Sequence, residues 1–319
     1  MTEIIHNFNH KSVLLDECIK GLDIKPNGVY VDGTLGGGGH ASAIAAKLGK
    51  DGRLIGIDRD GTAIAVATER LNAFKSQFTP VRDTHENIRQ VMNDLSVFSV
   101  DGFLLDLGVS SHQLDVPERG FSYRYDAPLD MRMDNRAAIT AYDIVNSYDE
   151  NELVSIIKKY GEERYAKRIA KGICAKRKNS PVETTAQLAD IIKNSVPFTP
   201  PSAGHPAMRT FQAIRIVVND ELTGLAKTIE DMANLLAPGG RICIITFHSL
   251  EDRIVKQTFK YWADPCTCPK SIPYCVCGVT PKLSLVTRKP IRPSEEELKE
   301  NTRAHSAKLR IAVASASLS

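Results

Sequence analysis

The sequence predicts an α/β protein with a doubly wound, Rossmann-like parallel sheet and an inserted helical subdomain. Three observations predict this fold. Short apolar segments alternate with segments of helical spacing over the first hundred residues, a glycine-rich turn joins the first such pair, and a helical region interrupts the alternation before it resumes. With 319 residues, 42% of them hydrophobic, the chain is long enough for one large domain with an insertion or for two domains.

Four segments are predicted as buried strands because they are short, largely apolar and bounded by polar residues or glycine. They are residues 29–32, 54–58, 78–81 and 103–107. Residues 41–48 and 62–74, which lie between them, have helical spacing. Strands that alternate with helices form a parallel sheet covered by helices on both faces, with the ligand site at the carboxyl ends of the strands.

A helical insertion is predicted from the change of pattern after Leu107. A long polar loop at residues 108–136 comes first, and helices are expected at 142–157, 162–176 and 184–193. We therefore predict an inserted domain at 128–205, and a main domain built from 1–127 and 206–319. The later part of the main domain is expected to contain helices at 210–236 and 250–261 and strands at 241–247, 283–286 and 307–313.

Composition limits the class of protein. No apolar run approaches the roughly 18 residues that a membrane span needs, so we expect a cytoplasmic protein with no membrane partner. The net charge of +3 decides little, because a local basic face can bind nucleic acid whatever the sum. Seven cysteines, an odd number, favour free thiols or a metal site over a disulfide framework.

The glycine-rich segment at residues 31–40 predicts a nucleoside cofactor. Glycine lets the backbone take positive φ angles and lets a ligand lie against it, and Asp58 follows Gly38 by twenty residues, where an acidic side chain binds ribose hydroxyls. Asp32 suits a cationic amino-acid tail better than a pyrophosphate, which favours S-adenosylmethionine. A nicotinamide-dependent oxidoreductase stays open as the alternative, because Ala41 in the last position of a G-x-G-x-x-G pattern is permitted.

Nine ordered motifs, distributed over nearly the whole chain, resemble those of the bacterial ribosomal RNA small subunit methyltransferase H family. They lie at residues 10–15, 32–40, 56–60, 104–113, 119–123, 128–134, 160–164, 205–213 and 247–253. The resemblance implies a seven-stranded class I methyltransferase sheet with an inserted helical domain. It also implies S-adenosyl-L-methionine as cofactor and N4-methylation of a cytidine in the decoding region of 16S rRNA. A homodimer is an open expectation.

The resemblance also implies which residues contact the cofactor. These residues are Gly38, Gly39, His40, Asp58, His85, Asp106 and Gln113, with His85 at a position where other members can have Phe. The candidates for orienting the cytosine amine and accepting its proton are Asp106, Ser110, Asp130 and His248, because loops after the strands face the cofactor in this fold. A ribosome-assembly factor that binds RNA without turnover is a further alternative.

RNA binding is predicted from residues 158–178, which hold nine Lys or Arg against two Glu. Arg164, Lys167, Arg168 and Lys171 fall on one helical face, and Ala166, Ile169, Ala170 and Ile173 on another. Near the site, Phe121, Tyr123, Arg124 and Tyr125 could hold a flipped base or pack the long loop, and the sequence does not separate the two.

Two C-x-C pairs, Cys266 with Cys268 and Cys275 with Cys277, could place four thiolates around zinc. Because C-x-C pairs are less typical of zinc sites than C-x-x-C pairs, the favoured interpretation is a loop of reduced thiols, and no metal ligand is predicted.

Overall fold

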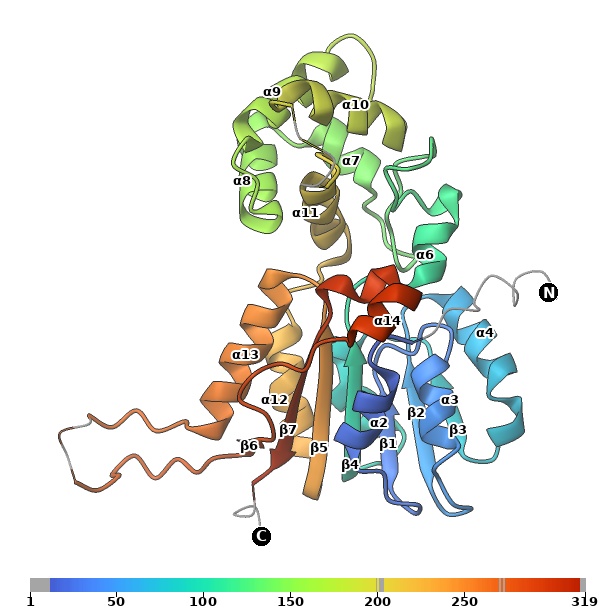
Figure 1. Cartoon of the computed structure of the whole chain (residues 1–319), viewed down its shortest axis with the longest axis vertical. Helices are drawn as coiled ribbons and strands as arrows, with labels where there is room; N and C mark the ends of the chain where they lie inside the picture. Colours follow the sequence, from blue (N-terminus) through green and yellow to red (C-terminus); the bar gives the residue numbers. More distant parts are fainter. Residues whose placement is uncertain (1–11, 199, 201–203, 270, 272, 316–319) are drawn as a thin grey trace. The chain divides into compact units, whose positions relative to one another are not determined.

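A computed structural model describes residues 12–198, 200, 204–269, 271 and 273–315. The chain divides into two units (Figure 1). The first combines Met1–Gly108 with Thr223–Ser319, and the second is Val109–Leu222. His10 and Lys11 of the first sequence motif lie outside the described residues.

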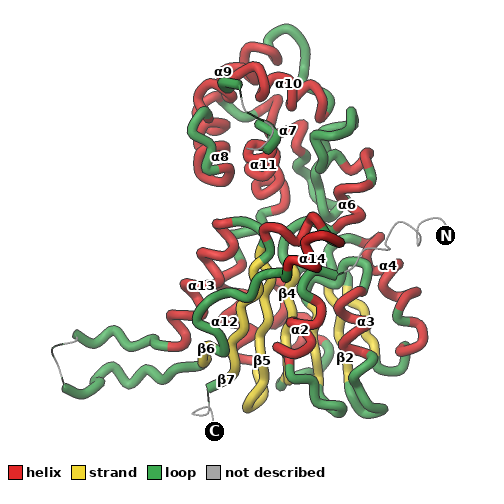
Figure 2. Tube along the Cα trace, viewed as in Figure 1, coloured by secondary structure: helices red, strands yellow, loops and turns green. Residues whose placement is uncertain are grey.

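The first unit is built on a seven-stranded sheet with the order β3-β2-β1-β4-β5-β7-β6 (Figure 2). The strands are β1 (Val29–Asp32), β2 (Arg53–Ile57), β3 (Phe78–Val81), β4 (Val100–Asp106), β5 (Leu236–Thr246), β6 (Leu283–Leu285) and β7 (Lys308–Ala314). Strands β1 to β5 pair in parallel, and β7 runs antiparallel to both β5 and β6. The predicted doubly wound α/β class is confirmed.

Helices cover both faces of this sheet because both faces of its strands are apolar. Tyr30 and Leu54 belong to one buried cluster, whereas their chain neighbours Val31 and Ile55 belong to another. The first cluster includes residues of α2 (Leu15–Leu22), α3 (Gly39–Ala45) and α4 (Gly61–Arg70), and the second includes residues of α5 (Ile88–Asp94), α12 (Leu225–Leu235) and α13 (Ser249–Ala263). The remaining elements of this unit are α14 (Glu295–Glu300) and the short 3-10 segments Asn72–Phe74, His85–Asn87 and Thr302–Ser306.

The second unit is helical and has its own core. Its elements are α6 (Ser111–Asp115), the 3-10 segment Pro117–Arg119, α7 (Ala141–Ser147), α8 (Glu150–Gly161), α9 (Ala166–Arg177), α10 (Thr185–Ser195) and α11 (Met208–Asn219). Helix α8 lies close against α11, since a Cβ on Gly161 would stand 2.7 Å from the carbonyl oxygen of Arg209. Phe211 and Ile214 of α11 are buried in the same core as Leu153 and Ile157 of α8.

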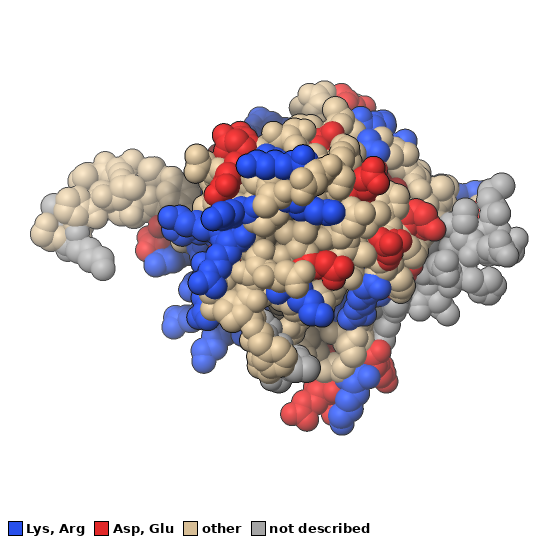
Figure 3. All heavy atoms as spheres, turned by 90° about the horizontal axis from the view of Figure 1, so that it is seen from above, with Lys and Arg blue, Asp and Glu red and all other residues tan. Residues whose placement is uncertain are grey.

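Helix α9 has the two faces that its sequence predicts. Ala166, Ile169, Ala170 and Ile173 are buried, and Lys167, Arg168 and Lys171 are exposed, as is Arg164, which lies just before the helix. In the space-filling view of Figure 3, Lys and Arg side chains gather toward one side of the surface that is shown.

Several predicted boundaries are wrong. The second unit extends beyond 128–205 at both ends, because α11 and the loop that carries Phe121 bury their apolar side chains in the helical core. The helix predicted at 210–236 is two helices, since Asp220 takes a left-handed conformation (φ 47°) that ends α11 before α12 begins. The helix predicted at 142–157 also divides, because Asp149 caps the start of α8.

Candidate functional site

Polar side chains collect where the five parallel strands of the first unit end. Asp32 and Asp106 are the last residues of β1 and β4, Asp58 directly follows β2, and His85 and His248 lie in the connections that leave β3 and β5. Since the carboxyl ends of parallel strands lie at one edge of the sheet, these residues share that edge. The strand register supports this, because Asp32 pairs with Leu104 and Asp106 with Ile245.

The glycine-rich turn lies directly after β1 and packs tightly against its neighbours. Gly38, the residue before α3, has a φ of 77°, and a Cβ there would stand 3.1 Å from the Cβ of Ala67. At Gly39 a Cβ would stand 2.1 Å from the Oγ of Ser12. A side chain at Gly39 would clash with Ser12, and one at Gly38 would press tightly on Ala67, so the two glycines let the backbone lie close to α4 and to Ser12.

Asp32, His40 and Asp106 form an ionisable cluster in which Asp32 and His40 are buried and Asp106 is partly exposed. The Nε2 atom of His40 lies 3.6 Å from Oδ2 of Asp106, and the Asp32 carboxylate accepts a hydrogen bond from the Thr34 amide. Burial raises the pKa of Asp32 to about 7, although His40 and the Thr34 amide oppose the shift. Burial alone would lower the pKa of His40, but the Asp106 carboxylate outweighs it and the pKa lies above its ordinary value.

This cluster contains buried polar atoms without hydrogen bonds. Oδ1 of Asp106 and both ring nitrogens of His40 have no hydrogen-bond partner within the part of the chain that the structure describes. Such atoms are rare in folded proteins, because each costs about 1–3 kcal/mol unless something binds it. Two carboxylates that converge beside an imidazole fit the ammonium and carboxylate of a methionine-type tail. The predicted cofactor residues His40 and Asp106 are thus brought together, with Asp32 beside them.

Asp58 is set to accept further hydrogen bonds from a ligand. Its Oδ2 accepts from the Gly36 amide and its Oδ1 from the Asp60 amide, both at 2.8 Å. Burial raises the pKa of Asp58, and these two amides limit the rise. Each carboxylate oxygen keeps a second lone pair, as ribose hydroxyls require.

His85 is buried and electrically neutral. Its Nδ1 lies 3.4 Å from the hydroxyl of Thr228, and burial, together with Arg59, lowers the pKa of His85 to about 3. The Cβ atom of His85 lies beside the glycine-rich turn, 3.5 Å from the position of a Cβ on Gly33, and a neutral ring there can pack against an uncharged base. It cannot supply a positive charge at neutral pH.

His248 caps α13 and is held by Glu251, a residue that the sequence interpretation missed. Glu251 is 1% exposed, and its carboxylate accepts hydrogen bonds from the amides of Phe247 and His248. The Nδ1 of His248 accepts from the Glu251 amide, and its Nε2 lies 3.1 Å from Oε1 of Glu251. A capping residue followed three positions later by Glu is the sequence signal that could have identified Glu251.

The remaining predicted residues belong to the second unit and have local partners there. Ser110 and Gln113 form the capping box of α6, with Gln113 buried. Asp130 makes a bidentate ion pair with Arg132, at distances from 2.7 Å. Burial would raise the pKa of Asp130, but Arg132 more than offsets it and the pKa is lowered, which makes this carboxylate a weaker proton acceptor.

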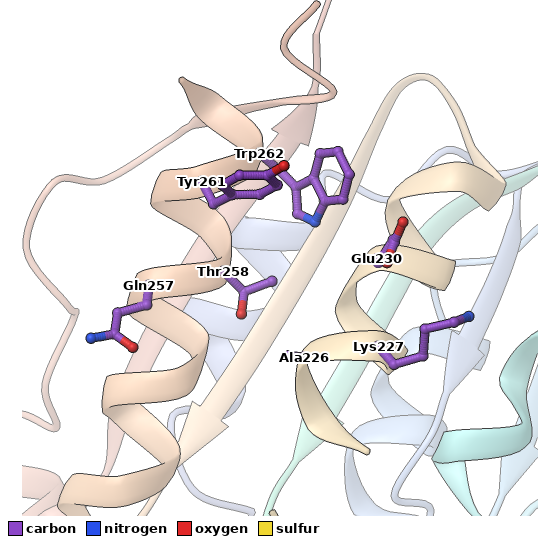
Figure 4. Close-up of a pocket in the computed structure, with 7 residues that line it drawn as sticks. All are labelled: Ala226, Lys227, Glu230, Gln257, Thr258, Tyr261 and Trp262. Carbon is purple, nitrogen blue, oxygen red and sulfur yellow. The ribbon is translucent and has the colours of Figure 1, made fainter. Parts of the chain in front are cut away.

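A shallow groove lies elsewhere, between α12 and α13 (Figure 4). Its lining is Ala226, Lys227, Glu230, Gln257, Thr258, Tyr261 and Trp262, and it contains none of the residues of the strand-end site. Lys282 covers the Trp262 ring at 3.9 Å, and Tyr261 packs edge-on to Trp262. We therefore place the functional site at the strand ends.

The sheet order, with an antiparallel strand inserted beside β5, and the acidic strand-end site define a class I methyltransferase that uses S-adenosyl-L-methionine. Residues 7–315 match the model of the MraW methylase family, and the chain belongs to that family. The nicotinamide-dependent alternative therefore does not hold.

Curated relatives match nearly end to end. The chain is 57% identical over 306 residues to the ribosomal RNA small subunit methyltransferase H 2 of Agathobacter rectalis, covering 95% of this chain and 98% of the relative. It is 55% identical to the ribosomal RNA small subunit methyltransferase H of Clostridioides difficile, with coverage of 96% and 98%. A solved SAM-dependent methyltransferase from Aquifex aeolicus is a distant likeness, with a TM-score of 0.42, 8% identity and 98% of each chain covered.

Among the described residues, no helix combines the length and the apolar character needed to cross a bilayer.

Proposed function

We propose that this protein methylates the exocyclic N4 amine of a cytidine in the decoding region of the 16S rRNA, in the cytoplasm. The observation that carries the proposal is the identity of more than half of all residues to relatives named ribosomal RNA small subunit methyltransferase H, over 98% of their length. RNA as substrate also agrees with the exposed basic face of α9.

The chemistry sets two demands on the protein. S-adenosyl-L-methionine supplies an electrophilic methyl group when it is bound. The cytosine amine is a weak nucleophile because its lone pair is delocalised into the ring, so the protein must hold the amine in line with the methyl carbon. As the N–C bond forms, the amine nitrogen must lose a proton to an acceptor.

Four side chains are the candidates for this acceptor and for orienting the amine. Asp106 is favoured, because its Oδ1 is a buried carboxylate oxygen without a hydrogen-bond partner among the described residues. Ser110 and Asp130 already have hydrogen-bond partners that fix their positions. His248 is the fourth candidate, and its Nε2 is likewise a buried atom without a hydrogen-bond partner among the described residues, although Oε1 of Glu251 lies 3.1 Å away. Ser110→Ala also removes the cap of α6, which costs about 1 kcal/mol of stability, so its turnover must be compared at equal folded fraction.

Each candidate is tested by replacement with alanine. A residue that acts on the amine should lower the rate of methyl transfer while the affinity for cofactor stays close to that of the wild type. A residue whose replacement leaves turnover unchanged is removed from the set. Asp106 lies in the cofactor cluster, so its replacement is expected to affect both quantities.

The basic face of α9 is proposed to contact RNA phosphates. Arg164 and Arg168 lie over the Tyr165 ring at 4.6 and 5.7 Å, which holds their guanidinium groups at the surface. Arg177 is excluded from this face, because it donates a hydrogen bond to the carbonyl of Val145.

Of the loop aromatics, Tyr125 is the one open to a flipped base. Phe121 is buried in the helical core, and Tyr123 stacks on His205 with 4.4 Å between ring centroids. Tyr125 is 45% exposed.

The proposal is tested with small ribosomal subunits that lack the modification. The protein and labelled S-adenosyl-L-methionine are incubated with these subunits, with free 16S rRNA or with large subunits, and the digested nucleosides are analysed by mass spectrometry. N4-methylcytidine from the small subunit or its rRNA supports the proposal. Cofactor binding without transfer to any RNA would favour the assembly-factor alternative, and a different methylated nucleoside would overturn the cytidine N4 assignment.

A further inference from the structure

The connection between α13 and β6 contains four cysteines whose sulfur atoms converge. The chain runs out from α13 and returns to β6 (Figure 1), and Cys266 and Cys268 lie on the outgoing part while Cys275 and Cys277 lie on the returning part. All four sulfurs lie within 4.8 Å of one another. The sequence favoured a loop of reduced thiols over a zinc site. All four cysteines are free, and their sulfurs converge in the arrangement that a zinc site requires.

The spacing of the sulfurs fits one tetrahedral metal ion. Cys275 lies 3.3 Å from Cys277, 3.6 Å from Cys266 and 3.8 Å from Cys268, sulfur to sulfur. A tetrahedral zinc ion with Zn–S bonds of about 2.3 Å requires sulfur separations of about 3.8 Å. A disulfide requires about 2.05 Å, and all four cysteines are free.

Nothing else in the described part of this connection accounts for its conformation. No backbone-to-backbone hydrogen bond is found between the described residues of 265–281. Tyr274 and Val276, which could have formed a small core, are 80% and 79% exposed. Ordering a residue costs about 1–2 kcal/mol of conformational entropy, which thiol contacts alone do not offset.

The base of the connection is closed by ordinary contacts. The Lys282 amide donates to the carbonyl of Trp262, and the Lys282 ammonium lies over the Trp262 ring. The backbone also donates to the sulfurs, with the Val276 amide 3.3 Å from Sγ of Cys268 and the Thr267 and Val279 amides directed to Cys277.

We infer that Cys266, Cys268, Cys275 and Cys277 bind one Zn²⁺ ion. This ion is structural, because it fixes the conformation of the connection between α13 and β6. Four protein ligands leave no open coordination position for a substrate, so the ion has no part in methyl transfer. Because the ligands come from both the outgoing and the returning part of the connection, zinc binding and the ordering of the described residues around the four cysteines are coupled.

The first test is metal analysis of the full chain purified without chelator and without a polyhistidine tag. We expect about one zinc per chain. The double variant Cys266→Ser/Cys275→Ser should lose zinc, and Cys174→Ser, which removes a free thiol of α9 in the other unit, should retain it. Replacing zinc with Co²⁺ should produce the intense visible absorption of tetrahedral thiolate coordination in the wild type and in the Cys174→Ser variant.

Three results would overturn the inference. The first is a protein purified without metal in which the thiols of all four loop cysteines are alkylated on denaturation. The second is the detection of two disulfides among these four cysteines by mass spectrometry. The third is full retention of zinc by the double variant. Stoichiometric iron would overturn the identity of the ion. As a second readout, chelation should accelerate proteolytic cleavage within residues 264–282, whereas cofactor affinity should not change.

Discussion

The imidazole of His40 lies 3.6 Å from the carboxylate of Asp106, although His40 belongs to α3, which follows β1, and Asp106 ends β4. Both side chains carry buried polar atoms that find no hydrogen-bond partner among the described residues. The cluster is therefore built for a ligand, and the free protein keeps part of its polar surface unsatisfied.

Replacing Asp106 with Asn should weaken cofactor binding strongly, because it removes the charge while it keeps the shape. Losing a hydrogen bond to a charged group costs about 1.5–3 kcal/mol, which corresponds to a Kd raised about tenfold to a hundredfold. Isothermal titration calorimetry measures the effect. Asp94→Asn, at an exposed residue of α5, is the control and should bind as the wild type does. Equal affinities of both variants would remove Asp106 from the cofactor site.

The stability of the cofactor-free protein should depend on the ionisation of Asp32. Its pKa rises from an ordinary 3.8 to about 7 on folding, so protonation stabilises the fold most below pH 3.8, and this contribution is lost as the pH rises to about 7. Asp32→Asn cannot ionise, so its stability advantage over the wild type should grow across this window to about 4 kcal/mol at most. Urea unfolding at pH 5, 6, 7 and 8 tests this. The exposed Asp51→Asn variant should follow the wild type at every pH.

Cofactor affinity should depend on the same proton. A cationic tail beside Asp32 favours its carboxylate form, so binding should release a proton and tighten as the pH rises from 6 to 8. Calorimetry in buffers of different ionisation enthalpy measures the released proton. Asp32→Asn should show a flatter pH dependence, and a wild type without this dependence would contradict the predicted contact.

Reversing two charges on α9, with Lys167→Glu and Lys171→Glu, should weaken RNA binding. If each lysine contacts one phosphate, the slope of log K against log salt should fall in magnitude by about 1.5, since each contact contributes about 0.7–0.9. The matched control is Lys256→Glu with Lys260→Glu, two exposed lysines with the same spacing on α13. An unchanged slope in the α9 variant would mean that its basic face is only solvated.

Gly38→Ala should destabilise the protein by about 1–2 kcal/mol from the left-handed backbone alone, with an added cost from packing. Gly239 is the control, because it has a similar φ of 73° against 77° but no atom within 4 Å of a Cβ, whereas Gly38 faces Ala67 at 3.1 Å. The difference between the two alanine variants in thermal unfolding isolates the contact with Ala67. A larger loss at Gly239 would contradict the tight packing of the turn.

Strand positions were predictable from sequence because local apolar pattern determines them. Residues 29–32 and 78–81 are strands as predicted. The helix at 210–236 was mispredicted because its apolar spacing continues through Asp220, whose left-handed conformation the spacing does not indicate. The first residues of β5 were not predicted as a strand, because Pro238-Gly239-Gly240 is typical of a turn. These three residues nevertheless lie in the strand.

The chemistry of the site was only partly predictable. Acidic residues at strand ends indicate a cofactor edge, and Asp32, Asp58 and Asp106 all lie there. The ion pair of Arg132 with Asp130 depends on a side-chain contact that no spacing reveals. Glu251 could have been found, since it follows the capping residue His248 by three positions, but this signal was not used. The four cysteine sulfurs likewise converge through the path of the loop, which spacing alone does not determine.

Strand β7 has a consequence for how the protein is made. It pairs with β5 from Arg241 to Thr246, yet it leaves the ribosome long after β5, when every other strand has been synthesised. Until then the backbone of β5 is an exposed edge that can pair with other chains. We therefore expect nascent chains that stall before Lys308 to be prone to aggregation, whereas the helical unit, contiguous from Val109 to Leu222, can complete its own core earlier in translation.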